Sequence, residues 1–497
     1  MPDAQVRLSE PAGKWVLAVA ILGSAVAALE STVINVALPA IGRDLDGDVA
    51  GLQWTLNGYL LTLAALILVG GSFGDRFGRR RVFIIGVIWF TVASALCALA
   101  PSVEALVAGR VLQGVGGALL APGSLAIIEA TFVREDRARA IGAWSALGGI
   151  AVAIGPLLGG WLVDQASWRW VFLINLPLGV VVVLAALRHV PETRDVDAPR
   201  GFDVLGSVLI TVALAGLTYG LITAGECGIG SALVIGALAI GVGAFAAFVL
   251  VERTSRHPML PLDIFASRQF TAANLVTLIV YASLGGVFFL LVVQLQTALG
   301  YSAMAAGAAS LPVTALMLVL SARAGAIAAR SGPRVLLTVG PLVIAAGMLL
   351  MLRIGPGSSY VGDVLPAVVV FGLGLSAVVA PVTATVLAAA DERHAGAASG
   401  VNNAVARTAQ LAAVAVLPLV AGLSGEAYSD PVALTDAFHT AMVVAAALAA
   451  VGGALAWLTI SNDVLEGQTE AEAERLTDYH CAIAGTPLSP QRSEAHA

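Results

Sequence analysis

The stretch Leu29–Pro39, LESTVINVALP, lies inside the first long apolar run of the chain, which extends over about 15–38. The run is long enough to cross a bilayer, yet it contains the carboxyl group of Glu30 and the amide of Asn35. A charge at membrane depth costs at least about 2.5–3.5 kcal/mol, so such groups usually face an interior cavity. Glu30 lies about 15 residues into the run, which is ~22 Å along a helix. We therefore interpret Glu30 as a working carboxylate; the alternative is a Glu at the level of the lipid headgroups.

The composition is that of a protein with many membrane spans. Of the 497 residues, 58% are hydrophobic and 12% are charged, whereas soluble domains carry about 25% charged residues. The three cysteines, Cys97, Cys227 and Cys481, give neither a disulfide framework nor the spacing of a metal site. Lys14 stands before a full-length span without a small-residue cleavage site, so we expect an uncleaved first helix.

Runs of about 20 apolar residues recur fourteen times along the chain, and each is long enough for a transmembrane helix. The fold class expected is therefore an all-α polytopic membrane protein. The spans are expected at 15–38, 52–73, 82–100, 104–130, 140–163, 170–189, 203–224, 231–251, 270–298, 303–328, 334–353, 363–389, 396–423 and 437–460.

The placement of basic residues predicts the orientation in the membrane. When the N-terminus is placed in the cytoplasm, most of the 26 Lys and Arg residues fall in cytoplasmic connections, among them Arg76–Arg81 and Val133–Arg139. The positive-inside rule then predicts a multi-pass protein of the inner (plasma) membrane with both termini in the cytoplasm.

An internal repeat predicts two related halves. GSFGDRFGRRR, Gly71–Arg81, follows the second span, and GAIAARSGPRV, Gly325–Val335, follows the tenth. The aligned segments share two glycines and two arginines, although Asp75 meets Ala329. Two parallel halves with a cavity at their interface are the architecture of an alternating-access carrier. We expect a cytoplasmic N-terminus at 1–14, a six-helix half at 15–189, two inserted helices with their connections at 190–269, a second six-helix half at 270–460 and a cytoplasmic tail at 461–497.

Three segments resemble motifs of one transporter family. Gly71–Arg81 looks like the loop signature between the second and third helices of the major facilitator superfamily. RVLQGVGG, Arg110–Gly117, resembles its fourth-helix motif. GGIAVAIGPLLGG, Gly148–Gly160, resembles the fifth-helix motif of its antiporters.

Further segments are similar to the fourteen-span drug:proton antiporters of that superfamily, the EmrB/QacA group. They are LESTVINVALP, WRWVFLINLPLG at Trp168–Gly179 and AGAASGVNNAVAR at Ala395–Arg407. The first-helix motif of the group usually has Asp where this chain has Glu30. The resemblance implies the major facilitator fold, with two six-helix halves and two inserted helices.

Glu30 and Arg110 are expected at the same depth. The first helix rises from the cytoplasm, and the fourth descends from outside with Arg110 about six residues, or ~9 Å, below the outer face. In a core of ~30 Å both groups lie about 21 Å from the cytoplasmic side. A nearby Arg lowers the pKa of a carboxyl group, whereas burial raises it. Movement of Arg110 would therefore make Glu30 bind and release a proton. A static ion pair is the alternative. Gln113 would extend the polar network one turn along.

The loop after the second span is interpreted as a conformational latch. Asp75 lies near the positive residues of its own loop, and Arg79 could reach Glu129 at the cytoplasmic end of the fourth helix. Charge pairs present in one state only bias an equilibrium between states. The alternative for the arginines is membrane topology alone. The latch candidates are Gly71, Asp75, Arg76, Gly78, Arg79 and Glu129.

The fifth span is rich in residues that allow close packing. Gly148, Gly155, Pro156, Gly159 and Gly160 permit close helix approach and a bend. We expect the small-xxx-small pair Gly155 and Gly159 to pack near the interface between the halves. Packing alone is the alternative, and a role in exchange comes from the resemblance only.

Polar residues in other spans are candidates for a substrate cavity. Arg407 lies near the middle of the thirteenth span, less than two turns after Asn402 and Asn403. A buried Arg requires acceptors or a wet cavity, and orientation of substrate, balance of a proton site and structural pairing all remain open. The full set of cavity candidates is Asn35, Asn57, Gln113, Gln294, Gln296, Asn403 and Arg407.

The sequence offers no catalytic motif with the right context. GGSFG, Gly70–Gly74, matches a hydrolase pattern, but no strand–turn–helix surrounds it. Lys14 is the only lysine and precedes a Trp, so no phosphate-binding loop of the Walker type is present. We expect no enzyme, no cofactor and no metal, and an ion gradient as the source of energy.

These observations and the resemblance together favour a proton-coupled antiporter that exports small compounds by alternating access, with a link to antibiotic resistance. The resemblance implies amphipathic or cationic drugs, dyes or natural products. Glu30 is the only carboxylate well inside a span, which favours neutral or singly charged substrates over dications. A proton-coupled metabolite importer and a non-transporting sensor are the alternatives. We expect a monomer in the lipid bilayer, with small molecules and protons as ligands and no nucleic acid.

Overall fold

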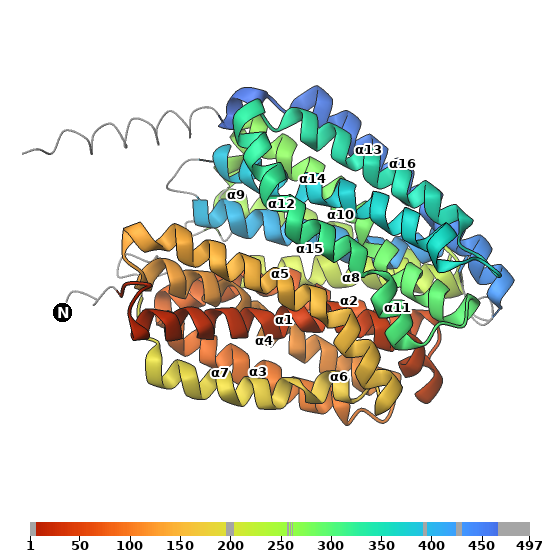
Figure 1. The fold of residues 1–497 in the computed structure, drawn as a ribbon, viewed down its shortest axis with the longest axis horizontal. Helices are drawn as coiled ribbons and strands as arrows, with labels where there is room; N and C mark the ends of the chain where they lie inside the picture. The colour runs from red at the N-terminus through yellow and green to blue at the C-terminus, as the bar shows by residue number, and fades with distance from the viewer. Residues whose placement is uncertain are drawn as a thin grey trace, which may run out of the picture.

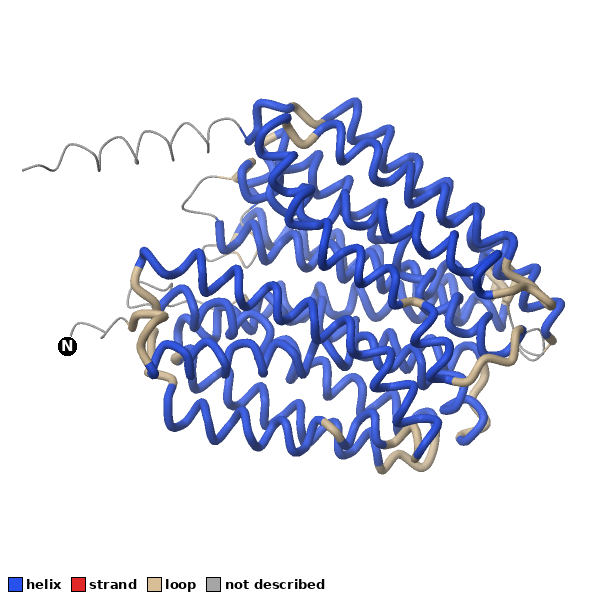
Figure 2. Tube along the Cα trace, in the orientation of Figure 1, coloured by secondary structure: helices blue, strands red, loops and turns tan. Residues whose placement is uncertain are grey.

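The computed structural model describes residues 6–194, 203–255, 258, 260, 262–390, 395–423 and 430–465. Fourteen helical segments within these residues are long and apolar enough to cross a membrane, and Figure 2 shows helices and loops with no strand in the described parts. The all-α polytopic fold class is therefore confirmed. The α-helices are α1 Pro11–Asp44, α2 Val49–Phe77, α3 Arg79–Ala98, α4 Val103–Thr131, α5 Arg134–Gln165, α6 Trp170–Leu173, α7 Asn175–His189, α8 Val204–Cys227, α9 Ala232–Thr254, α10 Arg268–Val293, α11 Ala303–Ala309, α12 Leu311–Ser331, α13 Arg334–Leu350, α14 Leu365–Ala388, α15 Ala395–Val420 and α16 Pro431–Thr459.

Local sequence explains where several of these helices start and stop. The side chains of Asp48 and Ser102 accept hydrogen bonds from backbone N–H groups in the first turns of α2 and α4, as N-cap residues do. Gly78 separates α2 from α3 with a φ of 110°, a conformation that favours glycine. The tenth span is divided into α11 and α12 because Pro312 lies in the first turn of α12 and has no N–H for a continuous helix.

The helices form two bundles (Figure 1). Helices α1 to α7, the first bundle, pack on one another, and helices α10 to α16, the second bundle, do the same. The inserted helix α8 packs on α9 and also contacts α2 and α15, one helix from each bundle. The outer helix α9 exposes large apolar side chains such as Leu233, Ile240 and Phe245, which suits a surface in contact with lipid.

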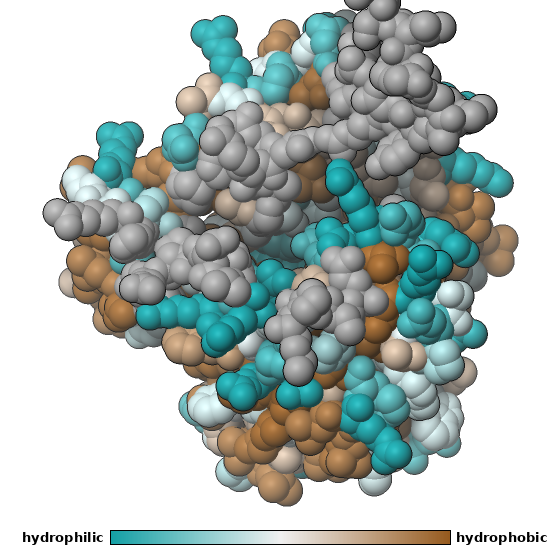
Figure 3. All heavy atoms as spheres, turned by 90° about the vertical axis from the view of Figure 1, so that its left-hand side faces the viewer, coloured by the Kyte–Doolittle hydropathy of each residue, from teal (hydrophilic) through white to brown (hydrophobic). Residues whose placement is uncertain are grey.

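The two ends of the molecule differ in how closely the bundles approach. We call the end that holds the start of α1 and the α2–α3 loop the basic end, and the end that holds Asp44, Gln165 and α11 the far end. Figure 1 shows the bundles meeting at the far end, on its right, and diverging toward the basic end. Figure 3 faces the basic end, where the surface is hollowed near its centre and hydrophilic side chains lie below the hollow and to its right.

Hydrogen bonds join the bundles near the far end. The Gln53 amide donates to the Val414 carbonyl at 2.8 Å, and the Gln296 amide donates to the Val36 carbonyl at 2.9 Å. The Asp164 carboxylate of α5 accepts from the first two backbone N–H groups of α11, at 3.1 and 2.9 Å. Toward the basic end, by contrast, a Cβ atom on Gly142, Gly148 or Gly149 would meet no atom within 4 Å. The described conformation is thus closed at the far end.

Replacement of Asp164 by Ala is expected to favour opening of the far end. The carboxylate contacts α11 only while the bundles meet there, and a negative charge at a helix N-terminus contributes up to about 1 kcal/mol, or roughly fivefold in a population ratio. Spin labels at Ala166 and Ala305 would report the distance between α5 and α11 by pulsed electron resonance. The neighbouring Gln165→Ala is the control, and an equal distance distribution in both variants would contradict the role given to Asp164.

Candidate functional site

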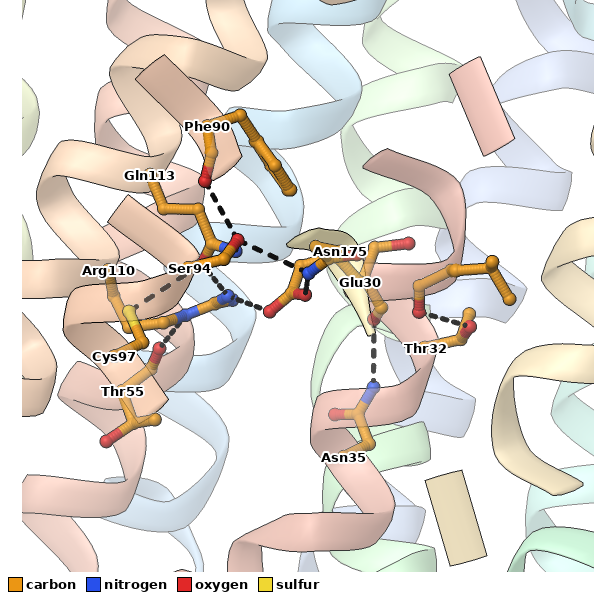
Figure 4. Close-up of polar contacts among 12 residues, drawn as sticks. Glu30, Thr32, Asn35, Thr55, Phe90, Ser94, Cys97, Arg110, Gln113 and Asn175 are labelled. Atoms are coloured by element: carbon orange, nitrogen blue, oxygen red, sulfur yellow. Dashed lines mark hydrogen bonds and ion pairs between the residues drawn. The ribbon is translucent and has the colours of Figure 1, made fainter. Parts of the chain in front are cut away.

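Glu30 and Arg110 form an ion pair at the centre of the first bundle (Figure 4). Each side chain is only 1% exposed. Arg110 Nη1 donates to Glu30 Oε1, and Asn175 Nδ2 donates to Glu30 Oε2 at 2.8 Å. Both carboxylate oxygens therefore have a donor, as a buried ionised carboxylate requires.

The contacts around this pair close into a ring. Arg110 Nη1 also donates to Gln113 Oε1 at 2.5 Å, and Gln113 Nε2 donates to Ser94 Oγ at 2.8 Å. Ser94 Oγ in turn accepts from Asn175 Nδ2 at 3.3 Å. We call Glu30, Ser94, Arg110, Gln113 and Asn175 the polar ring; they come from α1, α3, α4 and α7, so a shift of any of these helices disturbs it.

Backbone and aromatic groups complete the surroundings of Arg110. Its Nε donates to the Thr55 carbonyl at 3.0 Å, and its guanidinium carbon lies 4.7 Å from the centre of the Tyr59 ring and 5.8 Å from that of Phe172. Cation–π contacts of this kind gain strength when they are desolvated. The sequence led us to expect Glu30 beside an interior cavity, but in this conformation the polar ring is sealed from solvent.

Glycines in the fourth-helix motif bring the ring together. A Cβ atom on Gly114 would collide with Tyr59 and Thr62 of α2, and one on Gly116 would lie 2.6 Å from the backbone nitrogen of Phe90 in α3. Because these positions have no side chain, α4 packs closely against α2 and α3. That close approach places Arg110 and Gln113 inside the bundle.

The other predicted cavity residues lie outside the polar ring. Asn35 donates to the Ser31 carbonyl of its own helix at 3.2 Å, and Gln294 donates to Thr435 at 2.8 Å. Asn57 is fully buried, and neither atom of its amide has a hydrogen-bond partner. Gln296, as described, contacts α1. Asn403 is exposed and Arg407 is half-buried. Gln113 is thus the one member of this candidate set that joins the ring.

Two of the latch candidates, Asp75 in α2 and Arg79 in α3, pair with each other. Arg79 forms an ion pair with Asp75 at 2.8 Å, whereas no ion pair within 4.0 Å joins Arg79 to Glu129 among the described side chains. Arg80 and Arg81 lie 3.6 and 3.5 Å from Glu192 at the end of the first bundle. Gly71 and Arg76 occupy the last turns of α2.

The glycines of α5 contact two different partners. Cβ atoms on Gly155 and Gly159 would collide with Thr32 and Val33 of α1, so this pair packs within the first bundle and not at the interface between the bundles that we expected. Gly160 and Pro156 lie against α11 of the second bundle. The difference follows from helix geometry, since each step of one residue turns the side chain by about 100°.

Asn175 and Ser94 are site residues that the sequence analysis missed. Asn175 lies about five residues, or ~7.5 Å, below the outer end of its span, close to the depth calculated for Arg110. A depth calculation for every polar residue in a span, beyond the charged ones, would have found it.

A sequence profile described as the Major Facilitator Superfamily matches residues 20–414. The chain belongs to the major facilitator superfamily. The superfamily inferred from the motifs is therefore confirmed, and the fourteen spans expected from the apolar runs match the fourteen candidate membrane helices among the described residues.

Relatives within this superfamily carry names that refer to antibiotics. The chain is 38% identical to a tetracenomycin C resistance and export protein of Streptomyces glaucescens, over 83% of this chain and 77% of that protein. It is 34% identical to a puromycin resistance protein of Streptomyces alboniger, over 94% of each. It is also 34% identical to a methylenomycin A resistance protein of Bacillus subtilis, over 84% of this chain and 89% of that protein.

Solved structures of superfamily transporters share the fold at low identity. A bacterial homologue of the human lysosomal transporter Spinster, inward-facing and occupied, superposes with a TM-score of 0.66 at 17% identity, over 91% of this chain and 97% of that one. A POT family transporter in complex with a thioalcohol-conjugated peptide has a TM-score of 0.65 at 15% identity, over 88% and 94%.

The ion pair in this superfamily member is expected to show strong coupling in a double-mutant cycle. Loss of one partner of a buried pair leaves an uncompensated charge and costs about 3–5 kcal/mol. Glu30→Gln and Arg110→Gln are therefore each destabilising, and the double variant costs much less than their sum. The measurement is the free energy of unfolding in detergent of the wild type, the two single variants and the double variant. Additive losses would contradict a direct buried pair.

Two glycines of the α5 motif, Gly148 and Gly155, are expected to respond oppositely to substitution by Ala. Gly155→Ala introduces a collision with Thr32 and lowers stability by about 1–3 kcal/mol. Gly148→Ala adds a methyl group in open space and raises helix propensity, a gain of up to about 1 kcal/mol. Thermal unfolding of both variants tests this, and equal effects would show that α1 does not pack on α5 as described.

Proposed function

We propose that this protein is a proton-coupled antiporter that exports antibiotics and related small compounds across the plasma membrane. The resistance and export proteins to which it is similar support the export of natural products. The single observation that carries the proton coupling is the sealed ion pair of Glu30 and Arg110, because a permanent charge pair at this depth is costly without a function.

Transport would proceed by rocking of the two bundles about their shared interface, accompanied by a shift of helices around the polar ring in the first bundle. The positive-inside rule supports a cytoplasmic basic end, so the described conformation corresponds to an inward-open carrier. In this state the loss of the Glu30 proton to the cytoplasm would be coupled to the binding of substrate, and the donors of Arg110 and Asn175 would stabilise the ionised carboxylate. Opening of the far end would withdraw Arg110 from Glu30, and Glu30 would take a proton from outside.

Contacts at the two ends would then select between the states. Asp164, Gln53 and Gln296 hold the far end closed, and the Asp75–Arg79 pair lies at the basic end, where a latch would act. We retain the boundaries 15–189 and 270–460 for the two halves and a monomeric carrier as parts of this proposal.

The proton gradient supplies enough energy for such export. One elementary charge that crosses 100 mV yields about 2.3 kcal/mol, and about 1.4 kcal/mol corresponds to a factor of ten. One proton would therefore sustain roughly a fiftyfold gradient of a neutral compound from the voltage alone.

The decisive variant is Glu30→Gln, which keeps the size of the side chain and removes its titration. In proteoliposomes, addition of tetracenomycin C to the wild type is expected to produce a proton flux opposite to the drug flux, and Glu30→Gln is expected to lose at least about 90% of this flux. Drug binding by the same preparation serves as the folding test. The exposed Glu104→Gln at the far end is the matched control.

Other outcomes would identify other functions. Proton and drug flux in the same direction would indicate an importer, and binding without any flux would indicate a sensor. Full coupled transport by Glu30→Gln would remove Glu30 from the mechanism.

A further inference from the structure

One cation in the spans lies between the bundles without a carboxylate partner. Arg407 is half-buried in α15, and its Nη1 donates to the side-chain oxygen of Gln410 at 3.3 Å. No carboxylate lies within 4.0 Å of it among the described residues. The other cation deep in a span, Arg110, is neutralised by Glu30. The centre of the described molecule therefore carries an excess positive charge at Arg407.

The contacts of α15 place this charge at the junction of the bundles. On one side of Arg407, Leu411 joins an apolar cluster with Leu61 of α2, and Val414 accepts from Gln53 of α2. On the other side, Asn402 donates to Asn274 and Thr277 of α10. Asn403, Arg407 and Gln410 lie at helical spacing between these two faces, so this polar stripe faces the gap between α2 and α10.

Two tyrosines, one from each bundle, lie within electrostatic range of Arg407. Arg407 interacts electrostatically with the hydroxyl groups of Tyr59 on α2 and Tyr281 on α10. The Tyr59 ring also covers Arg110. Tyr59 is therefore within electrostatic range of both arginines, Arg110 in the polar ring and Arg407 between the bundles.

The buried amide of Asn57 independently supports a ligand site near Arg407. It lies one turn after Gln53 on α2, on the face that contacts α15. The α2–α15 pairs Gln53–Val414 and Leu68–Gly400 put Asn57 within about one turn, ~5 Å, of the level of Arg407. Its amide is fully buried, yet both polar atoms lack a partner, and a buried amide without a partner is costly. A ligand at Arg407 would lie within about one turn of this amide.

We propose that Arg407, Asn57 and Gln410 form an anion subsite between α2 and α15 that binds a single negative charge on the exported compound, such as a carboxylate or an ionised phenol. This inference rests on the proposed export function and specifies that the exported compounds carry a negative charge. A guanidinium suits a carboxylate because its N–H groups match the two oxygens, and an amide N–H adds a further donor. The same fixed charge repels cationic compounds.

Three fluorescent probes with one ring system and three charges test the subsite. They are anthracene-9-carboxylate, anthracene-9-carboxamide and 9-(aminomethyl)anthracene, each titrated by anisotropy against the full chain in nanodiscs of uncharged lipid, with empty nanodiscs subtracted. The wild type is expected to bind the carboxylate at least about tenfold more tightly than the carboxamide, and the ammonium probe most weakly.

Variants assign the preference to the subsite. Arg407→Gln is expected to weaken carboxylate binding about tenfold while carboxamide binding changes less than about twofold. Arg407→Lys, which keeps the charge, is expected to retain a preference of about threefold or more. Asn57→Leu is expected to weaken the carboxylate alone by about three- to tenfold, and its unfolding temperature on the same sample shows whether the fold is intact.

Several results would overturn the inference. They are equal or tighter binding of the carboxamide or the ammonium probe by the wild type, no binding of the carboxylate, or an undiminished carboxylate preference in Arg407→Gln. The export function is tested separately, because drug-induced proton release is measured in proteoliposomes and probe binding in nanodiscs. Proton release without a carboxylate preference would remove only the subsite, and the preference without proton release would remove only the export mechanism.

Discussion

The ion pair of Glu30 and Arg110 places two opposite charges where neither water nor lipid headgroups can reach them. Each charge is tolerable only while the other remains in contact and the remaining donors and acceptors are satisfied. The first bundle meets this constraint with Asn175, Gln113 and Ser94, and with glycines that let α4 approach α2 and α3. A proton on Glu30 would remove one charge and leave Arg110 to neutral acceptors, so protonation and helix packing are coupled by the same few contacts.

Closure of the far end determines that the bundles are separated at the basic end in this conformation. Contacts between the bundles gather where α5 meets α11 and where α2 meets α15, while the bundles diverge toward the basic end (Figure 1). The seam between α2 and α15 also holds Arg407 and the unpartnered amide of Asn57. The proton site lies inside the first bundle, whereas the proposed ligand site is shared by both bundles. Binding of a ligand there therefore depends on the relative position of the bundles.

The sequence predicted the features that depend on length, depth and motif. Apolar runs predicted the fourteen spans, and a rise of 1.5 Å per residue predicted that Glu30 and Arg110 lie at one depth. It did not predict features that depend on the rotation of a helix about its axis. Gly155 turned out to contact α1, Asn35 to bind its own backbone, and Asn57 to be buried without a partner. Asn175 was missed because a single amide in an apolar span gives a weak signal until its neighbours are known.

The central claim is that Glu30 exchanges a proton when the carrier binds its cargo. Infrared difference spectroscopy of the wild type at constant pH, before and after tetracenomycin C is added, would observe the carbonyl stretch of a protonated carboxylic acid directly. Glu30→Gln identifies the band. The account predicts that a band of protonated Glu30 decreases as drug binds and that no such change occurs in Glu30→Gln. An identical difference spectrum in both proteins would contradict it.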